Sequence, residues 1–260
     1  MAGGKETPRQ KMIGMMYLVL TALLALNVSS AILLKFQFLD SSLQEANTKS
    51  KVDNAAVVGG MEGIIKEIQK EGAKPKPREV QALANAQEVR VRTKALVDYI
   101  HELRAGLVDI TGGLTEEGHY ARPEGNDRVA EMMLGAGKNG KAYELKNKLD
   151  EYTKFLREYN QSVPASIALS GSEDPVAQND LDQKNKDFAE LNFEDTPLVA
   201  ALAVLSQKES EILKYEANTL QTLANVMGGV GKISTEDLFA MARAESKVCL
   251  LYTSPSPRDS

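Results

Sequence analysis

The chain has 260 residues, with 31 Lys and Arg residues against 36 Asp and Glu residues and a formal net charge of -5. This mildly acidic balance gives the chain as a whole no electrostatic footprint for nucleic acid, so nucleic acid is excluded as a partner. Aromatic residues make up 5% of the chain and Trp is absent, a composition that favours helix over strand.

The first predicted element is a transmembrane helix over residues 12–34. No charged side chain lies between Lys11 and Lys35, and a bilayer core needs roughly 20 apolar residues in one helix. Lys5, Arg9 and Lys11 precede the run, and this positive flank places residues 1–11 in the cytoplasm. The rest of the chain is then expected on the outer side of an inner membrane, in the periplasm.

A cleaved signal peptide is the alternative for this segment, because Ser29-Ser30-Ala31 would suit a signal peptidase. The apolar run continues past that point, through Leu34 to Phe36 and Phe38, which favours an uncleaved anchor. Small and polar residues within the span usually face another helix. They are Gly14, Tyr17, Thr21, Asn27, Ser29 and Ser30. Ser29 and Ser30 also suit the membrane–water interface at the outer end of the span. Tyr17 suits either the aromatic belt at such an interface or contact with a buried partner.

Apolar residues spaced by three and four predict amphipathic helices after the span. The series are Val57, Met61, Ile64 and Ile68; Leu96, Ile100, Leu103, Leu107 and Ile110; and Leu145, Leu149, Tyr152, Leu156 and Tyr159. Glycine and proline residues, which interrupt helices, set the expected limits of these helices. They run from about Asp40 to Gly72, then over 78–111, 127–134 and 141–160, with a weaker helix at 176–191 and a long last helix that ends at 227. The last helix is expected to use Thr196 as N-cap and Pro197 as its first residue.

These elements predict an all-α fold: one N-terminal transmembrane helix followed by an elongated helical bundle over residues 35–227. Helices of more than 30 residues exceed the globular average, which indicates an elongated bundle or pairing with a second copy. Residues 228–248 are expected to form a hinge and the start of a further domain.

The sequence contains no recognisable catalytic constellation, so we expect no enzyme, no cofactor and no metal centre. His101 is expected to be a solvated helix residue, and His119 lies in a polar loop where a weak divalent site is conceivable. The segment 228–232 departs from a phosphate loop because Val226 and Ile233 occupy required positions. The aspartates at 180, 182 and 187 do not have the spacing of a calcium loop.

The N-terminal string Pro8-Arg9-Gln10-Lys11-Met12-Ile13, continued by Met16 to Ala22 and Leu24 to Ser29, resembles the start of the GldM/PorM family. This family comprises gliding-motility and type IX secretion proteins of the Bacteroidota. The resemblance extends through the helical region to Ala244-Glu245-Ser246-Lys247-Val248. It implies a single-span inner-membrane subunit that forms a homodimer inside a ring of a multi-span GldL/PorL-type partner.

The resemblance also implies a motor driven by proton-motive force, whose periplasmic shaft carries motion to outer-membrane-associated components. Arg9 and Tyr17 match family positions expected to meet a membrane-embedded glutamate of the partner, and Asn27 is expected to support helix association. The alternatives are a static membrane-anchored scaffold or adhesion protein, and a secreted enzyme with its site outside this chain.

The last segment, residues 249–260, changes composition abruptly and supplies the only Cys, Cys249. It matches the translation of a transposon-adapter sequence used in DNA library preparation. We therefore expect the native sequence to end at Val248 and the chain to be an N-terminal fragment.

Overall fold

The computed structural model describes residues 8–227, without the side chains of Pro8 and residues 22–29. The elements are α1 (Pro8–Lys70), α2 (Pro77–Ile110), α3 (Asn126–Met133), α4 (Lys141–Arg157), the 3-10 turn η1 (Ala177–Asn179), α5 (Phe188–Phe193) and α6 (Leu198–Val226). No strand is formed within the described part, where Leu114 and Tyr120 make one isolated bridge. The predicted all-helical, elongated architecture is confirmed. The predicted hinge at 228–248 and the tail at 249–260 lie outside the described residues.

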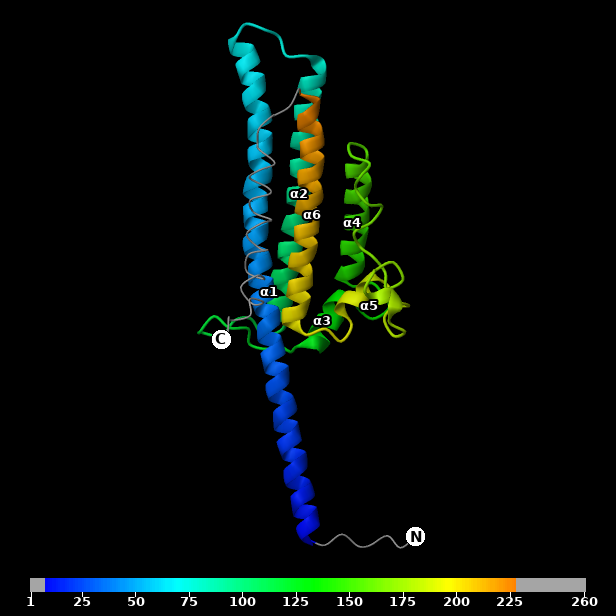
Figure 1. Cartoon of the computed structure of the whole chain (residues 1–260). Helices are drawn as coiled ribbons and strands as arrows, with labels where there is room; N and C mark the ends of the chain where they lie inside the picture. Colours follow the sequence, from blue (N-terminus) through cyan, green and yellow to red (C-terminus); the bar gives the residue numbers. More distant parts are fainter. Residues whose placement is uncertain (1–7, 228–260) are drawn as a thin grey trace, which may run out of the picture.

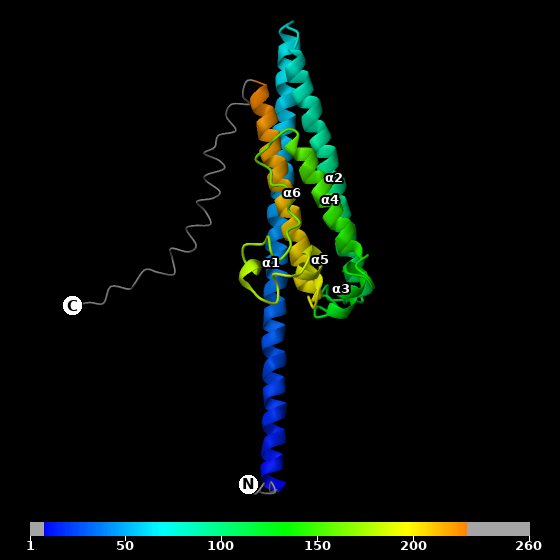
Figure 2. The ribbon, with the colours of Figure 1, turned by 90° about the vertical axis from the view of Figure 1, so that its right-hand side faces the viewer.

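Three long helices, α1, α2 and α6, lie side by side and form the body of the bundle (Figures 1 and 2). The chain runs up α1, down α2 and, after the shorter helices, up α6, so α1 and α6 are parallel. Helix α4 packs on the side of α2 and α6, and α3 and α5 lie at the lower end of the bundle. The first part of α1 extends below the bundle as a single projecting helix.

Helix α1 is continuous over 63 residues. The segment 12–34 and the helix from Asp40 are predicted as separate elements, but the structure joins them without a break. The reason is local: after Pro8 the helix contains no proline, and residues 35–46 include no glycine, so nothing interrupts its backbone hydrogen bonds. At 1.5 Å per residue, α1 is about 95 Å long.

The ends of α2 fall within one residue of the predicted limits. At its start, the Glu79 carboxylate accepts a hydrogen bond of 2.9 Å from the Lys76 backbone N–H, with Pro77 at the first helical position. At its end, Gly112 and Gly113 adopt φ of 105° and 76°, a conformation that glycine tolerates best. The Gly113 N–H closes the helix on the Val108 carbonyl at 2.8 Å.

The predicted helix at 176–191 is wrong. Only η1 and α5 form in this region, because aspartate side chains bind the backbone locally instead of allowing a helix. Asp174 accepts from the N–H groups of Val176 and Ala177, and Asp180 accepts from those of residues 182 and 183. Asp187 then caps α5 by accepting from the Glu190 N–H at 2.9 Å.

The predicted N-cap of the last helix is also wrong. Pro197, with extended backbone at ψ 153°, is the N-cap of α6, and the helix begins at Leu198. The Thr196 hydroxyl donates to the Glu194 carbonyl at 3.0 Å, so it is not available to the first turn of α6. The expected start was therefore displaced by one residue.

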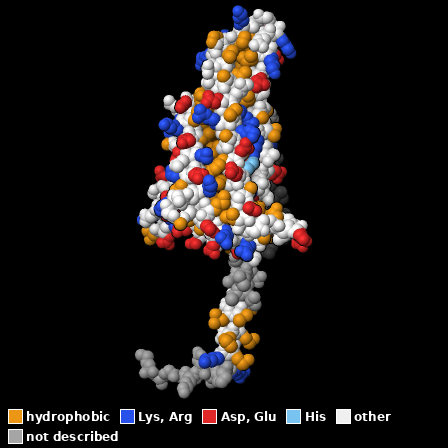
Figure 3. Space-filling view, turned by 180° about the vertical axis from the view of Figure 1, so that it is seen from behind, with side chains coloured by type: hydrophobic (Ala, Val, Ile, Leu, Met, Phe, Trp, Pro, Cys, Tyr) orange, Lys and Arg blue, Asp and Glu red, His pale blue; other side chains and the backbone are white. Residues whose placement is uncertain are grey.

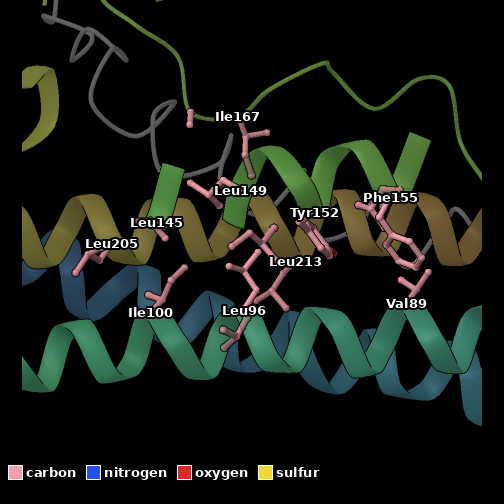
Figure 4. Close-up of a cluster of buried hydrophobic side chains, with 14 of the residues drawn as sticks. Val89, Leu96, Ile100, Leu145, Leu149, Tyr152, Phe155, Ile167, Leu205 and Leu213 are labelled. Atoms are coloured by element: carbon pink, nitrogen blue, oxygen red, sulfur yellow. The ribbon is translucent and has the colours of Figure 1, made fainter. Parts of the chain in front are cut away.

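The hydrophobic core contains buried side chains from every α-helix, and Figure 4 shows the part of it that lies between α2, α4 and α6. The predicted stripe of α4 is confirmed from Leu145 to Leu156, but Tyr159 lies beyond the end of the helix at Arg157 and is only partly buried. The stripe of α2 is confirmed from Leu96 to Leu107, but Ile110 at its end is 40% exposed. Apolar side chains spaced at helical intervals thus fill one continuous core along the bundle.

Within the residues that the structure describes, no helix combines the length and apolar character that a membrane crossing requires. The predicted span over 12–34 includes residues 22–29, whose side chains are outside the described part of the chain.

Candidate functional site

The projecting end of α1 exposes apolar side chains that the bundle does not cover. Every described side chain from Arg9 to Thr21 is exposed. The large apolar ones are 58% to 70% exposed: Met12, Ile13, Met15, Met16, Tyr17, Leu18, Val19 and Leu20. Figure 3 shows hydrophobic side chains on the visible face of this segment. A helix that is apolar on all sides is normally enclosed by lipid or protein, so this segment needs a cover that the described chain does not supply.

Arg9 and Tyr17, two of the predicted partner-binding residues, lie on this projecting segment and stand clear of the bundle. At about 100° per residue, Tyr17 is about 80° around the helix from Arg9 and about 12 Å further along. Both side chains therefore occupy the same half of the helix surface. The Thr21 hydroxyl donates to the carbonyl oxygens of Tyr17 and Leu18 at 2.9 and 3.0 Å, within the helix itself.

Asn27, the third predicted residue, belongs to α1, but its side chain is outside the described part. Its position follows from helix geometry alone. Eighteen residues make about five full turns, so Asn27 lies on the same side as Arg9 and about 27 Å along the axis. The three residues hence share one side of a helix, and a contact of Asn27 stays a prediction.

A second site, made of polar side chains, lies inside the bundle and was not predicted. Asp40, Asn47 and Asn54 of α1 follow one another at intervals of seven residues and are only 2%, 2% and 3% exposed. We call these three residues, with the side chains of α2 and α6 that they contact directly or through Glu216, the polar ladder. Those contacts are Arg90, Arg104, Ser206, Ser210 and Glu216.

Asp40 forms the rung nearest the projecting end. Its two carboxylate oxygens accept from the Arg104 guanidinium at 2.9 and 2.8 Å, a bidentate pairing. The Ser206 hydroxyl donates to Asp40 Oδ1 at 2.7 Å, and Gln44 donates to Oδ2 at 2.8 Å. This rung therefore joins α1, α2 and α6 through one buried ion pair.

The two asparagines bind α6 in the same way at successive heptads. The Asn47 side-chain amide donates to the backbone carbonyl of Ser206 at 2.9 Å, and its oxygen accepts from the Ser210 hydroxyl. Asn54 donates to the backbone carbonyl of Leu213 at 3.0 Å and to the Glu216 carboxylate at 2.6 Å. Both amides thus bridge α1 to the backbone of α6.

Glu216 completes the third rung and is fully buried. Arg90 of α2 donates to its other carboxylate oxygen at 3.0 Å. Burial raises the pKa of the Glu216 carboxyl above its ordinary 4.5, although the hydrogen bond from Asn54 and the charge of Arg90 act in the opposite direction. Burial outweighs them because no other cation faces this carboxylate among the described ion pairs.

Glu209 lies one heptad before Glu216 on α6 and corrects the expectation for His101. The Glu209 carboxylate is 2% exposed and meets the Lys51 ammonium at 2.6 Å and His101 Nε2 at 3.1 Å. His101 is half exposed, as expected for a surface helix, but its ring is held against a buried carboxylate rather than simply solvated. Its sequence neighbours on α2 indicated an exposed face, whereas the carboxylate that holds the ring comes from α6.

In the described part of the chain, no group of three or more His, Cys, Asp or Glu residues is placed to hold a metal ion. His119 lies in the turn after α2, where its carbonyl accepts from the Thr115 N–H at 2.7 Å. Its side chain borders a pocket between this loop and residues 30–37 of α1. The loop therefore packs against α1 where that helix enters the bundle.

The polar ladder predicts a specific pH dependence of stability. Because the pKa of Glu216 is raised on folding, its contribution to stability is full below 4.5 and is lost as the pH rises through the folded value. Glu216→Gln should remove this loss, so the difference in melting temperature between variant and wild type should grow in favour of the variant above pH 4.5. Circular dichroism melts from pH 4 to 8 measure it. Glu151→Gln, at an exposed position of α4, is the control, and parallel profiles for Glu216→Gln and wild type would contradict the prediction.

The fold and both sites define a class: a long helical bundle built on one continuous helix, with an uncovered apolar end and a polar ladder buried beside its hydrophobic core. The family model for the GldM N-terminal domain matches residues 31–225. The chain therefore belongs to the GldM family, as its resemblance predicted, and is a component of gliding-motility and type IX secretion machinery. No curated protein matches the sequence closely enough to serve as a relative.

Proposed function

We propose that this chain is a single-span subunit of an inner-membrane motor that uses proton-motive force to drive type IX secretion and gliding. One observation carries the proposal: the uncovered apolar end and the first helix of the bundle are the same 63-residue helix. A rotation or tilt of one end reaches the bundle without passing through a hinge.

The bundle has the packing that such a shaft requires. Helices α1, α2 and α6 lie side by side over most of its length, and closely packed interiors resist deformation. The apolar end needs a cover, which a bilayer with a multi-span GldL/PorL-type protein and a second copy of the chain would provide. The bundle itself would lie in the periplasm and act on outer-membrane-associated components of the secretion machinery.

Arg9 and Tyr17 are the residues proposed to couple the motor to its partner. They lie on one half of an uncovered helix, where a guanidinium and a phenol can reach an acidic side chain of a surrounding protein. Either group would stabilise the charged form of that carboxylate, and its withdrawal as the helix moves would favour protonation. Asn27 would support helix association from the same side.

Arg9→Ala and Tyr17→Phe should each reduce secretion and gliding at least about tenfold, the effect of losing a charge-assisted contact of roughly 1.5–3 kcal/mol. Neither change shortens the apolar segment, so protein abundance in the membrane fraction should stay constant. Secretion of a reporter cargo and gliding speed measure the effect.

Lys11→Ala and Met16→Leu are the matched controls, since they alter a neighbouring cation and a neighbouring exposed apolar residue. Both should secrete normally and should still co-purify a multi-span membrane protein. Normal secretion by Arg9→Ala and Tyr17→Phe would show that these two residues serve only topology and the membrane interface.

The proposed orientation predicts which positions an impermeant thiol reagent reaches. Lys74 is exposed in the turn between α1 and α2, at the end of the bundle furthest from the projecting helix. In a Cys249→Ser background, Lys74→Cys should react in intact cells, whereas Ala2→Cys should react only after lysis. Labelling of Ala2→Cys in intact cells, or release of the protein from membranes by carbonate, would contradict the single-span topology.

A further inference from the structure

The polar ladder fixes the axial position of α1 against α6 through a repeated spacing. Asn47 donates to the carbonyl of Ser206 and Asn54 to the carbonyl of Leu213, and each pair is separated by 159 residues. One heptad along α1 therefore corresponds to one heptad along α6. The same offset puts Met61, which is fully buried, at the level of Leu220, also fully buried.

A slide of α1 by one heptad toward the end of α6 would break this arrangement. Asp40 would take the place of Asn47 and face the backbone carbonyl of Ser206, so two acceptors would meet. It would also lose Arg104, its bidentate partner. A buried carboxylate without its cation is strongly disfavoured.

A slide in the opposite direction is disfavoured for another reason. Met61 would then take the level of Asn54, and its thioether would face the buried carboxylate of Glu216. Glu216 would lose the amide that donates to it at 2.6 Å. Because Asp, Asn, Asn and Met follow at successive heptads of α1, a slide of one heptad in either direction mismatches the first or the last level, and only one register satisfies all four.

We propose that the polar ladder is a register lock, which prevents α1 from sliding along α6 and so makes the projecting helix and the bundle move as one body. Apolar side chains packed between parallel helices can exchange one heptad for the next at little cost, whereas a buried amide or ion pair selects one alignment. The lock itself does not depend on the motor. Its role in transmitting motion rests on the proposed function.

Three double-cysteine variants can report the register, each combining Met61→Cys with a different position on α6. They are made in the full chain, in its native membrane and in a Cys249→Ser background. Met61→Cys with Leu220→Cys marks the native alignment. Met61→Cys with Leu213→Cys, or with Met227→Cys, marks a slide of one heptad in either direction. With the ladder intact, copper-catalysed oxidation should give the disulfide of the native pair and little of the other two.

Asn47→Leu combined with Asn54→Leu removes both amide contacts from α1. The yield of the native pair relative to the slipped pairs should fall about tenfold or more, as expected for the loss of the four hydrogen bonds that the two amides make. Asn147→Leu combined with Asn218→Leu, at exposed positions of α4 and α6, is the matched control and should leave the ratio unchanged.

The single variant Asn47→Leu keeps the test decisive if the double variant does not fold. Its partners are a backbone carbonyl and a serine hydroxyl, so no buried charge is left unpaired. It should shift the ratio in the same direction by a smaller factor. An unchanged ratio in folded protein would overturn the register lock whatever the secretion activity, whereas a shifted ratio with normal secretion would support the lock and count against the motor.

Discussion

Insertion of seven glycines after Lys35 should abolish secretion and gliding while leaving the bundle folded. Lys35 lies between the predicted span and Asp40, the first buried residue of α1 among those whose side chains are described. Each glycine in a helix interior costs about 1 kcal/mol relative to alanine, so seven in succession replace the continuous helix with a flexible joint. Motion of the projecting end would then be absorbed by the joint rather than passed to the bundle.

Seven alanines at the same place provide the matched control. They add the same number of residues, keep the helix, and change its phase by only about 20°, because seven residues are nearly two turns. Secretion by this variant should remain well above that of the glycine variant. A static scaffold or adhesion protein would tolerate both insertions, so equal activity of the two variants would contradict the motor and favour that alternative.

Arg104→Ala should lower the free energy of unfolding by about 3–5 kcal/mol, the effect of removing one partner of a buried ion pair. The Asp40 side chain is only 3% exposed and would keep a charge with its cation gone. Arg104 also donates to Ser206 at 2.8 Å and to the carbonyl of Leu202, so three helices lose a shared contact. Chemical unfolding followed by circular dichroism measures the loss.

Two comparisons separate the ion pair from the general effect of removing an arginine. Arg128→Ala breaks an exposed pair with Glu131 and should cost less than about 1 kcal/mol. Asp40→Leu with Arg104→Leu removes both charges and should recover most of the stability lost in Arg104→Ala. Equal stability of Arg104→Ala and wild type would show that Asp40 is not held by this cation.

Periodicity predicted most of the fold, because amphipathic helices carry their burial pattern in their own sequence. The stripe of α4 from Leu145 to Leu156 and the glycines that end α2 were enough to place those elements. The helix predicted over 176–191 does not form because its aspartate side chains bind nearby backbone N–H groups. The apolar pattern alone does not show that these side chains compete with the helical hydrogen bonds. Thr196 failed as N-cap because its hydroxyl binds the Glu194 carbonyl instead.

Of the two candidate sites, one was predicted from the sequence and the other was missed. Arg9, Tyr17 and Asn27 were selected by resemblance to a family, and helix geometry places them on one side of α1. The polar ladder was missed because its partners lie on helices more than 60 residues away. A signal was present: Asp40, Asn47 and Asn54 recur every seven residues, as do Glu209 and Glu216. Polar residues at heptad spacing in helices expected to be buried point to an internal network rather than to a solvated face.

The directions in which α1, α2 and α6 run along the bundle determine how it responds to force. The chain enters at the lower end of α1 and leaves α6 at the opposite end, so a pull between these points loads the parallel pair α1 and α6 in shear. In shear, the rungs at Asp40, Asn47 and Asn54 carry tension together, whereas in a peeling geometry they would break one after another. Forced unfolding is governed by the barrier to that collective rupture, so the bundle should yield at higher force along its axis than across it.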